Sequence, residues 1–491
     1  MARTTSRRPA SWPVIAAVIL AKSLVVSAQE NQEKTTVLLK PGQNLQAIVE
    51  DAPEGTVFLF EPGLYRMQTI YPKSRQEFLG QEGVILNGAM ELKSWSKASG
   101  LWRSEDLPPS LPFHGRCEAG RPLCTIREDL FFNGRLYQRV GSFEELGPGR
   151  WYQEGRRAYL SDDPIGQSVE LGVTPRAFGG EAHDVVLKDL IVEKYASDSQ
   201  QGAIFADNGY GWRISNVIAR WNHGAGLSFG SNTRVTGGAF SHNGQLGMAG
   251  IGENSRIEGV EIAFNNYAGY DARWEAGGTK FWETRGLTVL DSCIHHNGGP
   301  GLWTDNDNIH VTYQGNKVFL NADDGIKHEI SYDAIIRDNI VARNGTSAFD
   351  DWLWGAQILI QNSSNVKVYG NIVEVSDEFG NGIGVIHQDR GSGIYGAWIA
   401  ANNVVHQNTI IHLGRRGRNG VVTDTGDSDF WATANNSFDD NSYVVADRDG
   451  AYWTAKGGEE PWGNLRDMGL ERSGKLSEER RAPMTLSCGL E

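Results

Sequence analysis

Two acids and two lysines between residues 280 and 329 have the types and spacing that acid–base chemistry requires. They are Lys280, Asp305, Lys327 and Glu329. Two carboxyl groups can divide the roles of acid and base when their surroundings keep one protonated and the other ionised. A lysine serves as a base when its surroundings depress its pKa. These four residues are the candidate catalytic residues, provided that the fold brings them together.

Tryptophans and charged residues gather around these four positions. They lie in the segments 271–277 and 350–355 and between them: Arg273, Trp274, Glu275, Trp282, Trp303, Trp352 and Trp354. Tryptophan rings stack on sugar rings, so we expect these seven residues to bind a substrate. For any one tryptophan, covering an exposed sheet is an equally good interpretation.

The same region offers ligands for a hard cation. Asp305, Asp307 and Glu329 carry the carboxylate oxygens that Ca²⁺ prefers, so we expect Ca²⁺ as a cofactor. The ion would also help to depress the pKa of a nearby lysine. Taken alone, Asp307 is better interpreted as a turn residue that binds its own backbone.

A repeat must position all of these side chains. Its asparagines are mostly 21 to 24 residues apart, and each is followed four residues later by a small residue and five later by a large apolar one: Asn222, Asn243, Asn265, Asn297, Asn321 and Asn344. Weaker copies continue through Asn371 and Asn402 to Asn408. Coils of this length bury an apolar face only by stacking, and a fixed asparagine suits a ladder of side-chain amides.

Alternation along the strand after each small residue determines which side chains leave the core. If Leu302 and Thr304 point inward, the outward set contains Trp303 and Asp305 together with the equivalent residues of the neighbouring coils, Lys280, Trp282, Lys327 and Glu329. Neighbouring coils lie about 4.8 Å apart, so these groups are within reach of one another. We expect His328 to be buried, and Asp323 and Asp324 to be solvated turn residues.

The two segments that interrupt the repeat follow Tyr270 and Phe349, at the same point of coils three apart. At about 4.8 Å per coil they are about 15 Å apart. We interpret segments 271–277 and 350–355 as the walls of a groove, with the charged residues as its floor.

The whole pattern predicts an all-β chain, a right-handed parallel β-helix (solenoid) with an N-terminal cap and an inserted small β subdomain. We expect a signal peptide at 1–28, a cap and first coils at 29–91, the inserted subdomain at 92–180, coils with the groove at 181–429, and a C-terminal cap and tail at 430–491. The apolar run in the first segment is too short to span a bilayer stably. The mature protein is therefore expected to be secreted or periplasmic, and its last residues to be loose.

The net charge limits the classes of partner, and the cysteines indicate the compartment. Removing 1–28 takes away four positive charges and no acids, which moves the net charge from −14 to −18. An acidic surface argues against a nucleic-acid partner, and we expect a monomer without a membrane span. Cys117 and Cys124 could close a small loop in an oxidising compartment, whereas Cys293 is expected to be a packed thiol.

The chain resembles the pectate-lyase-like superfamily of right-handed β-helix proteins over residues 35–90 and 180–415. The resemblance rests on the opening 38–65 unit, on the Asn-x-x-x-Gly coils, and on the motifs Gly-Leu-Trp-x-Asp-x-Asp-Asn at 301–308 and His-Glu-Ile-Ser-Tyr at 328–332. It implies cleavage or epimerisation of a polysaccharide. It does not fix the reaction, because fold does not determine function.

Three functions remain open from the sequence. In a lyase, Lys280 or Lys327 would take the proton beside a uronic acid carboxylate that a calcium ion neutralises, as in some lyases of the superfamily. In a glycoside hydrolase, Asp305 and Glu329 would be the paired carboxylates. A non-catalytic glycan-binding protein would need only the tryptophans. The lysines and the clustered acids favour the lyase slightly.

Overall fold

The strands of the chain stack as successive coils, each contributing three short parallel strands. The computed structural model describes residues 34–105, 107–110, 112–347, 352–427, 429–455 and 458–489. The expected signal peptide, Phe349, and the residues Asp350 and Asp351 of the expected second groove wall lie outside the described residues.

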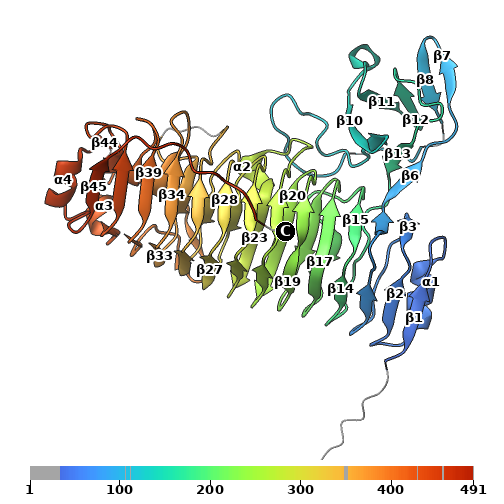
Figure 1. Cartoon of the computed structure of the whole chain (residues 1–491), viewed down its shortest axis with the longest axis horizontal. Coiled ribbons are helices and arrows are strands. Elements are labelled where there is room, and N and C mark those ends of the chain that lie inside the picture. Colours follow the sequence, from blue (N-terminus) through green and yellow to red (C-terminus); the bar gives the residue numbers. More distant parts are fainter. Residues whose placement is uncertain are drawn as a thin grey trace, which may run out of the picture. The chain divides into compact units, whose positions relative to one another are not determined.

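Two neighbouring coils illustrate the architecture (Figure 1). One contains β24 (Thr288–Leu290), β25 (Cys293–His295) and β26 (Leu302–Asp305), and the next contains β27 (Val311–Gln314), β28 (Lys317–Phe319) and β29 (Ile326–Glu329). Each strand pairs in parallel with its equivalent in the next coil. The result is a parallel β-helix whose apolar core, including Leu302 and Ile326, runs along the inside of the stack.

One sheet of this helix carries the candidate catalytic residues. Its central strands are β20 (Leu246–Glu253), β23 (Gly277–Arg285), β26, β29, β32 (Ala356–Gln361), β35 (Asn381–His387) and β40 (Asn419–Thr423). Because these strands are short and parallel, residues at equivalent positions form columns along the sheet.

The asparagine repeat forms the ladder that its spacing predicted. The side-chain amide of each asparagine donates to the side-chain oxygen of the next, at 2.8 to 3.0 Å, from Asn222 to Asn344. Gln357 takes the following position. Asn371 and Asn408 were wrongly assigned to this ladder: they belong to a second one, with Asn316, Asn339 and Asn441, at another turn of the coil.

A helix and an inserted sheet accompany the first coils. The helix α1 (Leu45–Asp51) buries Leu45 and Val49 near the first strands, as expected of a cap. The insertion forms an eight-stranded sheet between β6 (Ala89–Glu91) and β13 (Val169–Gly172), with a core of its own. Figure 1 shows this sheet standing beside the coils.

A loop of the insertion contacts the coils and is closed by the disulfide Cys117–Cys124. The Glu118 amide donates to the Gly269 carbonyl at 2.9 Å, and the Asp271 amide donates to the Arg116 carbonyl at 2.9 Å. The insertion therefore braces the segment that begins the first groove wall.

The C-terminal tail is not loose. After β45 (Lys475–Glu478) it runs back along the coils (Figure 1), where Met484 and Leu486 pack against Phe319. Cys488 forms a disulfide with Cys293, so the expectation of a packed thiol was wrong. Nothing in the repeat indicates this contact, because the tail lies outside it. Within the described ranges, no helix has the length and apolar character needed to cross a bilayer.

Candidate active site

The outward residues of β23, β26 and β29 lie side by side, as the alternation predicted. Among the outward residues, Trp303 pairs with Lys327 and Asp305 pairs with Glu329. The inward residues Phe281 and Thr304 pair in the same register. Thr304 faces the interior and is buried. The charged residues that we expected to form the floor of a groove are much less exposed than predicted. Lys280, Lys327 and Glu329 are all less than 9% exposed.

Asp305 has one oxygen bound and one free. Its Oδ2 lies 2.9 Å from the Lys280 ammonium nitrogen, whereas Oδ1 is buried without a hydrogen-bond partner among the described residues. Burial and the nearby charge of Glu329 raise the pKa of the Asp305 carboxyl above its usual range. The protonated form of Asp305 is therefore favoured.

Both oxygens of the Glu329 carboxylate are bound by neighbouring side chains. Its Oε2 accepts from the Lys327 ammonium at 3.0 Å and from the Trp303 indole at 3.1 Å, and its Oε1 lies 3.1 Å from Arg390. Burial alone would raise the pKa of Glu329, but Lys327 and Arg390 lower it below the usual range. Glu329 is therefore held ionised.

Lys327 is held in its protonated form. Burial alone would lower the pKa of its ammonium group, but the carboxylates of Glu329, Asp324 and Asp323 raise it above the usual range. The expectation that both aspartates are solvated was wrong for Asp324, which is buried and accepts from the Ala356 amide at 2.8 Å.

Trp303 lies between the two lysines instead of facing a sugar. The Lys280 and Lys327 nitrogens are 4.2 and 4.9 Å from its ring centroid, and its side chain is 2% exposed. Two ammonium groups and a neighbouring strand cover the ring, so it cannot serve as the stacking platform that we predicted. Its observed role is to donate a hydrogen bond to Glu329.

The first wall is the short helix α2 (Ala272–Glu275), and it touches the site directly. The Trp274 carbonyl accepts from Lys280 at 3.1 Å. The Glu275 Oε2 is 3.7 Å from the same ammonium and accepts from Gln200. Glu275 is buried, and burial raises the pKa of its carboxyl group, so its side chain packs beside Lys280 and has little surface for a ligand.

The other predicted substrate-binding residues lie at the edges. Arg273 is exposed, and its charge partly opposes the burial that raises the pKa of the Asp323 carboxyl group. The ring of Trp354 is 5.8 Å from the Lys327 nitrogen. Trp274, Trp282, Trp352 and Trp354 are half-buried and pack on neighbouring apolar residues. These four keep partly exposed surface near the carboxylates, although no described contact assigns them a ligand.

The proposed calcium ligands do not converge. Asp307 Oδ1 accepts from the Trp398 indole at 3.0 Å, and its Oδ2 accepts from the Ile394 amide at 3.2 Å. Asp305 Oδ2 is bound by Lys280, and the two oxygens of Glu329 are bound by Lys327 and Arg390. Within the described residues, these three carboxylates do not come close enough together to hold one ion. Asp307 does not bind its own backbone, as its position taken alone indicated, because its carboxylate binds the distant segment that contains Ile394 and Trp398.

Two residues of the site were missed by the sequence analysis. Arg390 comes from the irregular segment after β35, where no repeat indicates its direction. Gln361 follows Glu329 in the column, because the two are paired in the register of β29 and β32, so the repeat could have identified it. Gln361 is 2% exposed, and its Oε1 has no hydrogen-bond partner among the described residues.

His328 is a buried structural residue, as expected. Its Nε2 lies 2.6 Å from the Tyr332 carbonyl and its Nδ1 lies 2.7 Å from the Thr304 hydroxyl. Burial lowers the pKa of its ring to about 4. His328 is therefore neutral near pH 7 and supports the strand from the core side.

Comparison with known proteins identifies the fold. Residues 202–391 match the family model for the right handed beta helix region. The fold is that of the right-handed β-helix proteins. This confirms the fold class that the asparagine repeat and the resemblance to the pectate-lyase-like superfamily predicted.

Several solved structures have a similar arrangement of strands. A complex of XylC with xylose aligns with a TM-score of 0.66 and 14% identity, over 88% of this chain and 82% of that chain. The A-module of AlgE6, a mannuronan C-5 epimerase of Azotobacter vinelandii, aligns with a TM-score of 0.45 and 11% identity, over 82% of this β-helix chain and 93% of that module. None of the curated proteins matches the chain significantly.

Proposed function

We propose that this β-helix protein is a glycoside hydrolase with Asp305 and Glu329 as its carboxylate pair. The observation that supports the proposal is the contrast between two neighbouring acids. Burial raises the pKa of Asp305, whereas Lys327 and Arg390 lower the pKa of Glu329, which also accepts a hydrogen bond from Trp303. Glycoside hydrolases need this combination of one acid and one carboxylate.

Each group has a definite task in the proposed reaction. Asp305 gives its proton to the glycosidic oxygen while the bond from that oxygen to the anomeric carbon breaks. Glu329 stabilises the positive charge that develops on the carbon. Water supplies the hydroxyl group that replaces the leaving group and the proton that restores Asp305, so one water is consumed for each bond broken.

Gln361 is the residue that we expect to bind a sugar hydroxyl beside this pair. An acceptor that is buried without a partner costs about 1–3 kcal/mol. The Nε2 of Gln361 donates to Gln388 at 3.2 Å, so its unpartnered Oε1 is held in a fixed position. A ligand hydroxyl that donates to Oε1 would remove the cost of burying it.

The same contacts argue against the lyase that the sequence favoured slightly. Lys327 is held protonated, so it is a poor base. Lys327 and Arg390 are paired with the Glu329 carboxylate, which leaves them already neutralised toward a uronic acid. We therefore favour a neutral polysaccharide. Xylose, the ligand of the similar solved structure, is a neutral sugar, so a polysaccharide of xylose provides a first test substrate.

The cleavage assay distinguishes the alternatives. Neutral and uronic acid polysaccharides are incubated with the mature protein, with calcium or with a chelator, while reducing ends and the ultraviolet absorbance of unsaturated products are measured. We expect reducing ends from a neutral substrate, no unsaturated product and no effect of the chelator. Unsaturated product that requires calcium would overturn the proposal in favour of the lyase.

Two variants test the pair itself. Asp305→Asn and Glu329→Gln should each abolish cleavage while the thermal melt stays close to that of the wild type. Glu283→Gln is the matched control, because Glu283 is an exposed acid on β23 of the same sheet. Binding of glycans without cleavage on the whole panel would favour a glycan-binding protein. The two disulfides fit an oxidising compartment, which supports secretion as part of this proposal.

A further inference from the structure

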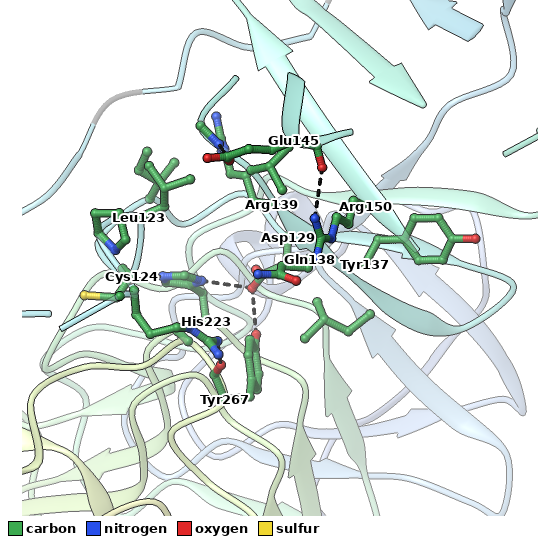
Figure 2. Close-up of a pocket in the computed structure, with 18 residues that line it drawn as sticks. Leu123, Cys124, Asp129, Tyr137, Gln138, Arg139, Glu145, Arg150, His223 and Tyr267 are labelled. Atoms are coloured by element: carbon green, nitrogen blue, oxygen red, sulfur yellow. Dashed lines mark hydrogen bonds and ion pairs between the residues drawn. The ribbon is translucent and has the colours of Figure 1, made fainter. Parts of the chain in front are cut away.

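A cavity of about 550 Å³ lies between the inserted sheet and the coils, with a lining that excludes the carboxylate pair (Figure 2). Its polar lining comes from both parts of the chain and includes Asp129, Gln138, Arg139, Arg150, His223 and Tyr267. We propose that this cavity is a second carbohydrate-binding site that takes a short neutral oligosaccharide. The saccharide class rests on the proposed function, whereas the existence of the cavity does not.

One end of the cavity is a carboxylate in a fixed orientation. The Oδ2 atom of Asp129 lies 2.9 Å from the Nδ1 of His223 and accepts from the Tyr267 hydroxyl at 2.6 Å (Figure 2). Its Oδ1 accepts no hydrogen bond from the described residues. An oriented carboxylate oxygen beside a cavity is a good acceptor for sugar hydroxyls.

His223 holds this carboxylate in its orientation. Its Nε2 lies 2.9 Å from the Cys124 carbonyl, which can only accept, so both ring nitrogens face acceptors. Burial alone would lower the pKa of His223, but Asp129 raises it. The ring is therefore favoured as an imidazolium that donates to Asp129 and to Cys124. The adjacent disulfide Cys117–Cys124 limits the movement of this end of the cavity.

Other parts of the lining supply donors and an apolar surface. Arg139 lies 4.7 Å from the Trp151 ring centroid and donates to Gln153 at 3.2 Å, so its guanidinium group is held in place. Arg150 donates to the Glu145 carbonyl at 3.1 Å. The apolar part of the lining consists of Leu123, Ile126, Leu136 and Val140. A few fixed polar groups beside apolar surface, in a cavity of about 300–1,000 Å³, are typical of small-molecule sites.

The charges of the lining largely offset one another. Arg139 is 3.6 Å from the Glu128 carboxylate, and the acids Asp129 and Glu145 share the lining with Arg121, Arg150 and His223. The choice of a neutral ligand therefore follows from the proposed function and not from the charge of the cavity. The segment from Tyr267, which lines the cavity, continues to Glu275 at the candidate active site, so one stretch of chain borders both places.

Two substitutions test the cavity without touching the carboxylate pair. Gly141 lines it, and an added Cβ there would meet only Glu145 Oε2, at 3.8 Å. Gly141→Leu should therefore fill part of the cavity without disturbing the fold, and Asp129→Asn should remove the charged acceptor. Gly147→Leu is the matched control, because Gly147 has open space around it and does not line the cavity.

Binding of xylotriose, cellotriose and trigalacturonate is measured by calorimetry on the full chain carrying Asp305→Asn, so that cleavage does not interfere. We expect a neutral trisaccharide to bind. Its Kd at the cavity site should rise about tenfold or more with Gly141→Leu and with Asp129→Asn. Gly147→Leu should leave this Kd unchanged. Equal binding by all three variants, or no binding of either neutral probe, would overturn the proposal. Preference for trigalacturonate would overturn the neutral ligand. If a trisaccharide binds in the cavity but the unsubstituted protein cleaves no glycan, the second binding site is retained and the proposed hydrolase activity is rejected.

Discussion

Asp305 and Glu329 are direct partners in the register of two parallel strands, yet the pKa of the Asp305 carboxyl is raised and that of the Glu329 carboxyl is lowered. Lys280 binds only one oxygen of Asp305. Glu329 receives hydrogen bonds or ion pairs from three side chains. The opposite pKa shifts of the two acids therefore follow from the number of hydrogen-bond donors around each carboxyl group. The pairing of the two strands only brings the two residues close together.

This difference predicts a bell-shaped dependence of kcat/KM on pH. Cleavage requires protonated Asp305, so activity is lost as the pH rises through the raised pKa of Asp305. It also requires ionised Glu329, so activity is lost as the pH falls through the lowered pKa of Glu329. Because the two acids interact, the limbs report the pair as a whole. A profile that keeps rising with pH through the neutral range would instead indicate a base such as an unprotonated lysine.

Replacing Arg390 should move the acidic limb of this profile. Arg390→Met removes the ion pair to Glu329 Oε1, which raises the pKa of Glu329, and kcat should fall about tenfold as one charge-assisted hydrogen bond is lost. The control is Arg337→Met, because Arg337 pairs with Asp338 on the surface at 2.8 Å. An acidic limb and a kcat that both match the control would show that Arg390 does not act on Glu329.

The contrast between Asp305 and Arg390 shows what the sequence could and could not predict. The repeat determines the strand, the face and the neighbour of Asp305, because every coil has the same period. Arg390 belongs to the segment whose Ile394 and Trp398 bind Asp307. Its approach to Glu329 depends on these tertiary contacts, which no period encodes.

Burial limited the prediction of roles in the same way. Trp303 points outward as the alternation predicted, but whether an outward side chain meets solvent depends on what covers the sheet. Lys280 and Lys327 cover the ring of Trp303, and Gln200 binds Glu275 of the inserted segment. The sequence therefore predicted the direction of Trp303 but not the contacts that bury Trp303 and Glu275.

The indole of Trp303 should matter for catalysis through its N–H group alone. Trp303→Phe retains a ring between the two lysines and removes the donor to Glu329 Oε2. A hydrogen bond to a charged group is worth about 1.5–3 kcal/mol, so kcat should fall roughly 10- to 100-fold, while the circular dichroism spectrum and the melting temperature change little. Trp102→Phe, at a half-buried tryptophan of the inserted sheet, serves as the control. Equal kcat values for the two variants would contradict a role for the indole N–H.

Gln361→Met should have opposite effects on stability and on substrate binding. In the free protein it removes an unpartnered buried oxygen that costs about 1–3 kcal/mol, so the melting temperature should rise. In the complex it removes the acceptor for a sugar hydroxyl, so KM should rise about tenfold with a smaller change in kcat. Gln407→Met is the control, because Gln407 donates to Asp440 at an exposed site. A rise in stability with unchanged KM would place the substrate away from Gln361.

The two disulfides should differ in how much they stabilise the chain. Cys293 and Cys488 are 195 residues apart, whereas Cys117 and Cys124 are 7 apart. The loop-entropy relation gives about 5 kcal/mol for the long loop and about 2 kcal/mol for the short one. Replacing both cysteines of the long pair by serine should therefore lower the unfolding midpoint in denaturant more than the same change in the short pair. The tail would also lose the packing of Met484 and Leu486 on Phe319.

Activity provides the second half of this last test. Cys293 lies on β25, whereas the carboxylate pair lies on β26 and β29 of the other sheet, so the serine variant of the long pair should keep its kcat and KM at temperatures where it is folded. The short pair closes the loop that braces the first groove wall through Gly269 and Asp271. Its loss should therefore raise KM although it costs less stability. If the long pair changed KM and the short pair did not, the tail, and not the inserted loop, would be the element that positions the wall.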